Sequence, residues 1–311
     1  MKNIESIGGG EMPVEEKAEI LSELMYRIQP DFEDFRGAKG FSDYDLRRDQ
    51  RKLEDKNWRD GGRFKSESAE DRYAKEAEPI VTFVLNHGSF LPSRETYSYL
   101  ASEFDDKING TDVVFGVERK DHRGDTVFSV DVATGTNADS IREKFRVSEK
   151  NYWVANLDYC MHENKRWSER EAPHFILGMM PASLDRAMDK VRIGEGTMVR
   201  EPDATTDFIL ASEMYEQIKM QIADVESGYH DDMTDRQLAK LRELKPAVQM
   251  KLYKVCNVRG DTKEARAEDF AVKYAKIMKQ MRGDLVYRNI IDEVRRINDR
   301  NNGRKANGAL R

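Results

Sequence analysis

The sequence contains few cysteines and no long hydrophobic run. Its only cysteines, Cys160 and Cys256, lie far apart, and no CxxC pair or Cys/His cluster has zinc-ligand spacing. One disulfide could join them, but reduced thiols in a cytoplasmic protein are the simpler prediction. The longest apolar stretches are far shorter than a membrane span, and residues 1–17 have no apolar core. We therefore expect neither membrane insertion nor a secretory signal.

The chain also lacks the common motifs of nucleotide-binding enzymes and of serine or zinc hydrolases. There is no Walker, Rossmann or GxSxG motif, and the glycines at 8–10 do not follow a strand as a phosphate loop would require. No HxH or HExxH spacing occurs, so the histidines are predicted to be loop or surface residues. The five histidines are His87, His122, His162, His174 and His230.

Charge is plentiful but nearly balanced. Charged residues make up 35% of the chain and hydrophobic ones 39%, with a net charge of -6. This acidic balance argues against duplex binding by the whole surface, because phosphate contacts need clustered Lys and Arg, but it leaves room for a local basic groove. Aromatic residues make up 9% of the chain, and with a modest net charge this argues against a disordered protein.

The distribution of apolar residues predicts an α/β fold in which a small mixed sheet with flanking helices carries helical extensions at both ends. The apolar residues gather in the middle of the chain, and charge-rich helical patterns lie on either side. We divide the chain into a charged, partly helical N-terminal extension (1–77), an α/β core domain (78–200), a helical C-terminal region (201–297) and a flexible basic tail (298–311).

The charge-dense segment 31–78 allows two interpretations. Aromatic and apolar residues, including Tyr44 and Trp58, are scattered among its many charges. One interpretation is a partly ordered helical arm. The other is an arm that contacts RNA or DNA, since basic residues interleaved with aromatics can bind phosphates and stack on bases. The acidic residues in the same segment weaken the second interpretation.

Within the core, local patterns predict alternating helices and strands. Residues 109–110 (Asn-Gly) are a strong turn signal, and the loop at 119–125 separates two β-rich runs that read as a hairpin. The predicted elements are an apolar segment fitting a helix (78–91), a helix (93–108), the two hairpin strands (111–118 and 126–134), a helix (138–145), strands at 151–160 and 174–182, and a helix (183–193).

Three carboxylates stand at the joints of the hairpin region. Asp112 opens the first hairpin strand, and Asp131 lies between two valines in the second, where an unpaired charge would be costly. In a regular hairpin the start of one strand lies beside the end of the other, so these two acids can approach each other. Glu103 would join them from the preceding helix. Such acids repel unless a cation joins them, and Mg²⁺ (or Mn²⁺) suits carboxylate oxygens.

This arrangement resembles the core of the PD-(D/E)xK nuclease superfamily, which has the restriction-endonuclease-like fold. The resemblance covers about residues 78–180 and implies a hydrolase that cleaves phosphodiester bonds in DNA or RNA with a bound Mg²⁺. Glu103 would be the helix acid, Asp112 the hairpin acid and Asp131 the acid of the last motif, all three as metal ligands.

The chain departs from the family pattern at one position. The residue two after Asp131 is Ala133, where the family has lysine. Some members move this basic residue to the following helix, so Lys144 is the catalytic candidate and Arg142 its alternative. Glu118 is a further carboxylate within reach of the hairpin.

Other functions remain open from the residues alone. Asp112 can cap a turn, Asp131 can pair with a basic side chain, and Glu103 can belong to a solvated helix end. The resemblance also allows a degenerate relative of the nucleases that binds nucleic acid. The chain could also be a non-enzymatic helical scaffold that binds a protein partner or itself through its flanking helices.

Overall fold

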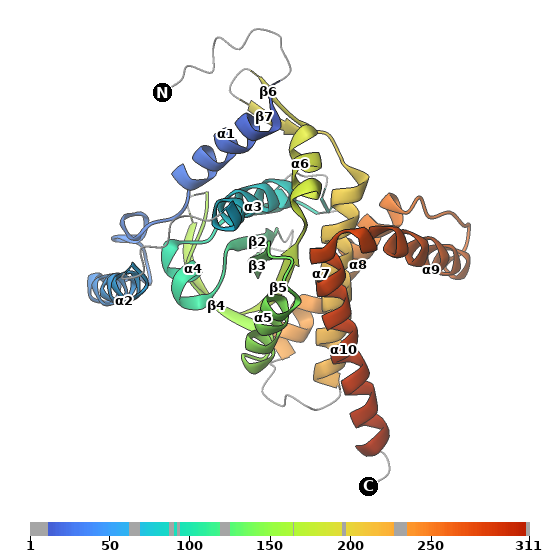
Figure 1. Ribbon diagram of the computed structural model, residues 1–311. Coiled ribbons are helices and arrows are strands. Elements are labelled where there is room, and N and C mark those ends of the chain that lie inside the picture. Colours follow the sequence, from blue (N-terminus) through green and yellow to red (C-terminus); the bar gives the residue numbers. More distant parts are fainter. Residues whose placement is uncertain are drawn as a thin grey trace.

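A mixed five-stranded sheet lies at the centre of the fold (Figure 1). The structure, a computed structural model, describes residues 12–61, 69–86, 90–91, 94–118, 125–163, 165–194, 197–226 and 235–308. The strands of the sheet are β1 (Thr96–Leu100), β2 (Val113–Val117), β3 (Thr126–Ala133), β4 (Val154–His162) and β5 (Lys165–Gly178). Their order in the sheet is β1-β2-β3-β5-β4.

The sheet combines an antiparallel meander with one parallel pair. Strands β1, β2 and β3 follow one another antiparallel, and helix α5 (Ala138–Lys150) then carries the chain away from the sheet. Strands β4 and β5 form an antiparallel hairpin, and β5 returns beside β3 in parallel. A crossover helix is the usual connection for such a parallel pair.

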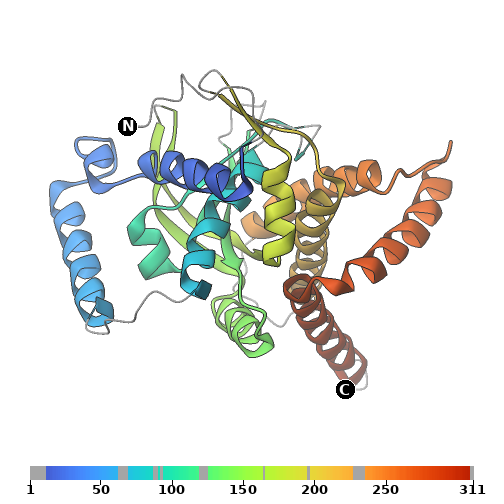
Figure 2. The same ribbon diagram turned by 45° about the horizontal axis from the view of Figure 1, so that its top comes forward.

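Helices flank this sheet and extend from it at both ends of the chain. Figures 1 and 2 show α2 and α9 projecting on opposite sides of the sheet. The remaining elements are α1 (Val14–Arg27), η2 (Phe32–Phe35), α2 (Asp43–Gly61), α3 (Ala69–Asn86), α4 (Glu103–Asn109), α6 (Pro181–Asp189), β6 (Val191–Gly194), β7 (Thr197–Arg200), α7 (Ala204–Glu226), α8 (Asp235–Val255), α9 (Lys263–Gln280), η3 (Met281–Gly283) and α10 (Leu285–Gly308).

The alternation of residues along β3 separates two cores. Phe128, Val130 and Val132 point into the larger core, which α1, α3 and α7 share. Ser129, Asp131 and Ala133 point to the opposite face, because successive side chains of a strand alternate. There Ala133 packs in a second apolar cluster with residues of α5 and α10. Two polar residues of β3 therefore face the side covered by α5.

Helix α7 hydrogen-bonds to residues 174–178 of β5, which pair with β3 on one side and extend past the pairing with β4 on the other. The Gln221 side chain donates to the carbonyl of His174 (2.8 Å), and Gln217 both donates to and accepts from the backbone of Ile176 (2.6 and 2.9 Å). Glu213 accepts from the Gly178 N–H (2.9 Å). These three side chains recur every four residues, so they lie on one helical face. They satisfy backbone groups that would otherwise be buried without partners.

The α/β core and the helical extensions predicted from the sequence are confirmed. Hairpin strands β2 and β3 lie within the predicted ranges 111–118 and 126–134. Most of their predicted connecting loop, residues 119–124, lies outside the described residues.

The helix predicted at 93–108 is wrong. Its first half forms strand β1, which pairs with β2, and only its end is helical, as α4. Tyr97, Leu100 and Phe104 fit helical spacing, but Tyr97 and Tyr99 also alternate with Ser98 and Leu100 as in a strand. Pairing along a whole strand decides between the two patterns, and local spacing does not contain that information.

Two further differences concern the ends of elements. Residues 165–172 lie between the strands predicted at 151–160 and 174–182, and they form the first part of β5. Helix α10 runs to Gly308, through most of the segment 298–311 for which a flexible tail was predicted.

Candidate active site

Asp112 and Asp131 lie opposite each other at one end of the β2–β3 pair. The last paired residues of the ladder are Val113 and Val130, so the next step places Asp112 opposite Asp131 on the same face of the sheet. The Asp112 N–H donates to the Val130 carbonyl (3.0 Å), and the Val132 N–H donates to Asp112 Oδ2 (2.6 Å). The approach predicted for these two acids is therefore present.

The turn before Asp112 places it at this position. Helix α4 ends at Gly110, whose φ of 69° is the left-handed conformation that glycine adopts without strain. Thr111 follows, and its N–H donates to the Asp105 carbonyl (3.1 Å). The chain therefore enters β2 directly after a short, well-capped helix.

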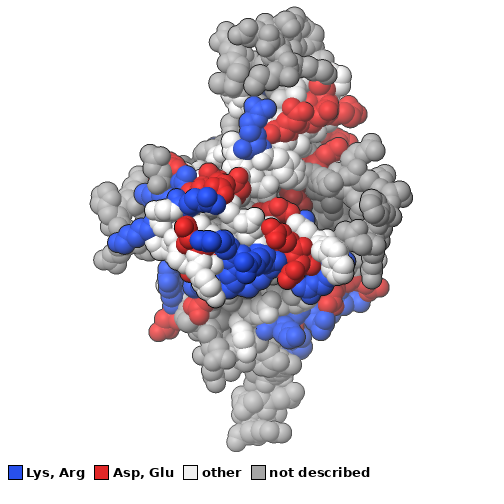
Figure 3. Space-filling view, turned by 90° about the vertical axis from the view of Figure 1, so that its left-hand side faces the viewer, with Lys and Arg blue, Asp and Glu red and all other residues white. Residues whose placement is uncertain are grey.

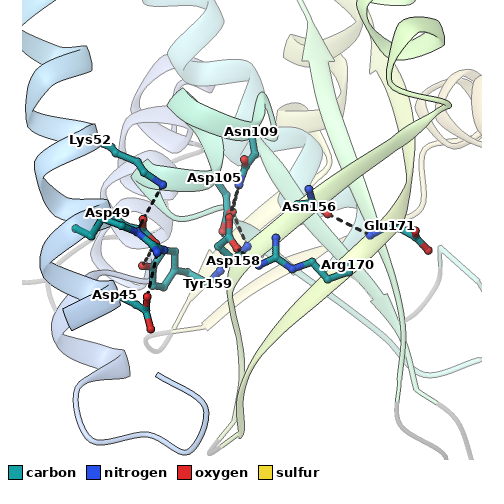
Figure 4. A network of polar contacts seen from close by, with 11 residues as sticks. Asp45, Asp49, Lys52, Asp105, Asn109, Asn156, Asp158, Tyr159, Arg170 and Glu171 are labelled. Atoms are coloured by element: carbon teal, nitrogen blue, oxygen red, sulfur yellow. Dashed lines mark hydrogen bonds and ion pairs between the residues drawn. The ribbon is translucent and has the colours of Figure 1, made fainter. Parts of the chain in front are cut away.

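The position of α4 depends in turn on a buried carboxylate, Asp105, shown in Figure 4. Asp105 accepts hydrogen bonds from the N–H groups of Asp158 (2.8 Å) and Tyr159 (3.0 Å) on β4 and from the Asn109 side chain (2.7 Å). A buried carboxylate with several donors is a structural anchor. Asp105 thus joins the end of α4 to β4.

Lys144 of α5 reaches the same end of the hairpin. Its Nζ donates to Asp131 Oδ1 in an ion pair, and the Asp131 side chain is 14% exposed. Burial acts to lower the pKa of Lys144, but Asp131, Asp112 and Glu78 together outweigh it and raise that pKa. Lys144 is therefore a charged ammonium at neutral pH.

A second candidate base, Arg142, points elsewhere. Its guanidinium pairs with Asp139 (2.8 Å) on its own helix and approaches Glu293 of α10 (3.7 Å). Glu118, at the far end of β2, interacts with His162 of β4 (3.3 Å). These partners of Arg142 and Glu118 therefore do not include Asp131 or Lys144.

Glu103 is not part of the group. It begins α4, where it pairs with Lys107 (3.0 Å) and accepts from Asn57 of α2 (3.1 Å), and its side chain is 52% exposed. The burial that would raise its pKa is outweighed by these two partners, which lower it. The predicted role of Glu103 as the helix acid required a helix at 93–108, which the strand β1 replaces.

A different glutamate, Glu78 of α3, occupies the neighbourhood instead. Burial, followed by the charges of Asp106 and Asp131, raises the pKa of Glu78 to about 7, while Lys144 acts to lower it. Burial, Asp131 and Glu78 likewise raise the pKa of Asp112 well above its ordinary value. Glu78, Asp112, Asp131 and Lys144 are thus one electrostatically linked group, which we call the acid cluster.

The acid cluster borders a pocket of about 550 Å³ lined by residues of α5, β3, β4 and β5 together with the turn at 109–110. Asp131 and Lys144 line its wall. A ligand from solvent can therefore reach Asp131 and Lys144, whereas Glu78 and Asp112 are not among the residues that line the pocket.

His174 of β5 lines the same pocket. Its Nδ1 and the Ser129 hydroxyl share a hydrogen bond (2.8 Å), and Ser129 in turn contacts the Thr111 hydroxyl (2.8 Å). Burial lowers the pKa of His174 to about 4, so the ring is neutral at pH 7. The pocket therefore holds a neutral imidazole beside acidic groups.

The donor set favours a hard cation. Glu78, Asp112 and Asp131 offer only carboxylate oxygens, the ligands that Mg²⁺ and Mn²⁺ prefer. In this conformation the cation that Asp131 holds is the Lys144 ammonium. Within the described ranges, no three Asp, Glu, His or Cys side chains are already gathered in metal-binding geometry. Metal binding would need these carboxylates to move closer together.

Sequence reasoning missed Glu78 and His174. Glu78 precedes Pro79 in the apolar segment 78–91. The acid of the first core helix was sought on the helix predicted at 93–108, and searching the segment 78–91 instead would have found Glu78. The strand-like alternation of residues 96–100 was the available signal. His174 opens the apolar run of β5, and no spacing marks it as a pocket residue.

Comparison of the chain with protein-family models, with curated proteins and with solved structures finds no match. Across the described residues, no helix combines the length and apolarity needed to cross a bilayer.

Proposed function

We propose that this protein is a metal-dependent nuclease of PD-(D/E)xK type, which cleaves phosphodiester bonds in DNA or RNA. The observation that carries the proposal is the pair Asp112 and Asp131, opposite each other at the end of a hairpin, with Lys144 on Asp131. The chain order supports it as well: α3 precedes the antiparallel strands β1, β2 and β3, with α4 between β1 and β2. Helix α5 and strand β4 follow, and β5 then returns parallel to β3.

Glu78, Asp112 and Asp131 would hold Mg²⁺ or Mn²⁺, which would supply Lewis-acid stabilisation of charge on the phosphate. Lys144 is the substitute for the lysine absent at Ala133. Its ammonium would orient the attacking water and balance the charge of the phosphate.

His174 would act from the other side of the pocket. Held neutral by burial and oriented by Ser129, its ring would hydrogen-bond to the bound phosphate or to the leaving group. The pocket, open to solvent beside Asp131, is large enough to admit a nucleotide phosphate.

The test is cleavage of single- and double-stranded DNA and RNA with Mg²⁺ or Mn²⁺ and with EDTA. We expect metal-dependent cleavage that falls by more than about 100-fold in Asp112→Asn, Asp131→Asn and Lys144→Met. Glu103→Gln and Arg142→Ala are matched controls, because neither side chain touches the acid cluster, and both should retain activity. Activity that survives Asp131→Asn, or that Glu103→Gln abolishes, contradicts the proposal.

A second candidate is a non-enzymatic relative that binds nucleic acid or serves as a scaffold. The Lys144–Asp131 ion pair favours it, because this pair neutralises Asp131 without a metal. In that case folded wild-type protein shows no metal-dependent cleavage, and Asp131→Asn changes only stability.

A further inference from the structure

Helix α2 carries two large aromatic side chains that face solvent. Tyr44 is 75% exposed and Trp58 is 82% exposed, whereas Leu46 and Leu53 are buried against the body. Both rings therefore offer their faces to a ligand that can stack on them.

Arginines lie on the same face as the two aromatics. Arg47 and Arg51 follow Tyr44 at intervals of three and seven residues, and Trp58 follows Arg51 by seven, so these four side chains share one helical stripe. With a rise of 1.5 Å per residue, the stripe from Tyr44 to Trp58 is about 21 Å long. We call these four residues the α2 stripe.

Carboxylates of α2 pair with cations beside the stripe. One carboxylate, Asp55, lies on the stripe itself, four residues after Arg51 and three before Trp58, so the stripe region holds two arginines and one acid. Asp49, on the inner side of the helix, pairs with Arg48 (3.0 Å) and Lys52 (2.9 Å). Arg47 donates its Nε to the Asp43 carbonyl of its own helix (3.2 Å). In the described part of the chain no carboxylate pairs with Arg47 or Arg51. Figure 3 shows Lys and Arg on this side of the molecule, with Asp and Glu lying among them.

Contacts at the C-terminal half of α2 connect it to the helix before the acid cluster. The Asn57 side chain donates to Glu103 (3.1 Å) and accepts from Lys107 (2.8 Å), both on α4. Helix α4 leads through Gly110 directly to Asp112. In the N-terminal half of α2, Asp49 accepts a hydrogen bond from the Tyr159 hydroxyl of β4 (3.1 Å), as drawn in Figure 4. The stripe is therefore held in a defined position relative to the pocket.

We propose that the α2 stripe binds single-stranded nucleic acid, with bases stacked on Tyr44 and Trp58 and phosphates held by Arg47 and Arg51. Exposed aromatics interleaved with unpaired arginines fit this ligand, because a single strand offers both unstacked bases and phosphates. A duplex offers only its phosphates to such a surface. The inference rests on the proposed nuclease function, which gives nucleic acid as the substrate class. It adds that the preferred substrate is single-stranded.

The experiment is binding of a fluorescein-labelled oligothymidylate, long enough to span α2, to the full chain in EDTA, followed by fluorescence anisotropy. Trp58→Ala and Tyr44→Ala are each expected to weaken binding about 5- to 100-fold, and Trp58→Phe should restore part of the loss. Arg51→Ala should weaken binding and reduce the slope of log affinity against log salt by about 0.7.

Two matched control variants lie on the opposite side of the chain. Val272→Ala removes an exposed apolar side chain from α9, and Arg288→Ala removes an exposed arginine from α10. Both should bind the oligonucleotide as the wild type does. A duplex of the same length should bind more weakly than the single strand, and Trp58→Ala should not change its affinity.

The outcomes separate this inference from the proposed nuclease function. Binding in EDTA that Trp58→Ala weakens supports the α2 stripe even if no cleavage occurs, a result that would contradict the nuclease alone. Affinity that is absent, or unchanged in Trp58→Ala and Arg51→Ala, overturns the inference whether or not the protein cleaves. A change of native mass in Trp58→Ala without oligonucleotide binding also overturns it, because the stripe would then be a self-association surface.

Discussion

Asp112 accepts a hydrogen bond from the N–H of Val132, the residue next to Asp131, at a distance of 2.6 Å. This bond locks the carboxylate of one strand against the backbone of the other, so the two acids are held beside each other by the hairpin itself. It lowers the pKa of Asp112, but burial and the charges of Asp131 and Glu78 raise it by more. When ionised, Asp112 is therefore repelled by Asp131 and Glu78, and a bound cation would reduce this repulsion.

Glu78→Gln should stabilise the fold above neutral pH. The pKa of Glu78 is raised to about 7 from an ordinary value of 4.5, so the folded state binds its proton more tightly than the unfolded chain. The stabilisation from this tighter proton binding is fully present below pH 4.5, where Glu78 is protonated in both states. It is lost as the pH rises through 7. We expect the free energy of unfolding at pH 8 to rise by about 1 to 2 kcal/mol in the variant.

Urea unfolding of both proteins at pH 5 and pH 8 measures this effect. Glu103→Gln is the control, since Glu103 is exposed and pairs with Lys107. Equal stability of Glu78→Gln and wild type at pH 8 would show that Glu78 is not under repulsion. Metal-dependent cleavage should fall in Glu78→Gln and persist in Glu103→Gln.

His174→Gln should reduce the loss of stability in acid. Burial lowers the pKa of His174 to about 4 from 6.5, so the unfolded chain takes up the proton first as the pH falls. Stability is complete above pH 6.5 and is lost between pH 6.5 and 4. Between pH 7 and pH 5 the wild type should lose about 2 kcal/mol more than the variant. Denaturant unfolding at the two pH values tests this, with exposed Arg288→Ala as the reference; parallel losses would contradict it.

Mn²⁺ should raise the melting temperature more at pH 8 than at pH 6. Glu78 and Asp112 have raised pKa values, so both must release protons before they can bind a cation. A ligand that binds only the folded state stabilises it. Differential scanning fluorimetry with Mn²⁺ or with K⁺ at matched ionic strength measures the shift. Asp112→Asn should abolish it and Glu103→Gln should keep it; an equal shift at both pH values would refute the coupling.

Gln217→Leu should destabilise the fold by about 2 to 4 kcal/mol. The substitution leaves the N–H and the carbonyl of Ile176 buried without partners, which costs about 1 to 3 kcal/mol for each group. Gln249→Leu is the matched control, because the bond that Gln249 makes among the described residues is to Tyr253, one turn away on α8. Thermal unfolding compares the two. A loss in Gln217→Leu no larger than in Gln249→Leu would show that α7 does not stabilise the edge of β5.

Local sequence patterns predicted those parts of the fold that depend on interactions between residues close in the chain. The turn at 109–110, the alternation along 126–133 and the resulting approach of Asp112 and Asp131 depend on residues close in the chain, and the structure contains all three. Lys144 was proposed from the family resemblance, because some members carry their basic residue on the helix after the hairpin.

Glu103 and Glu78 mark the limit of such prediction. Both are glutamates on helices beside the hairpin, and only the pairing of β1 with β2 decides which of them approaches Asp131. That pairing depends on backbone hydrogen bonds between β2 and the segment 96–100, whose local spacing fits a helix equally well. His174 enters the pocket through the parallel pairing of β5 with β3, which no local pattern records.

The sequence by itself determined the α/β class, the helical extensions and the hairpin that opposes two acids, because periodicity and turn chemistry act over a few residues. The tertiary structure alone decided which glutamate joins them, that Lys144 and not Arg142 pairs with Asp131, and that Tyr44 and Trp58 remain exposed on α2. These depend on long-range packing, which selects one face of each helix for burial and leaves the other to solvent.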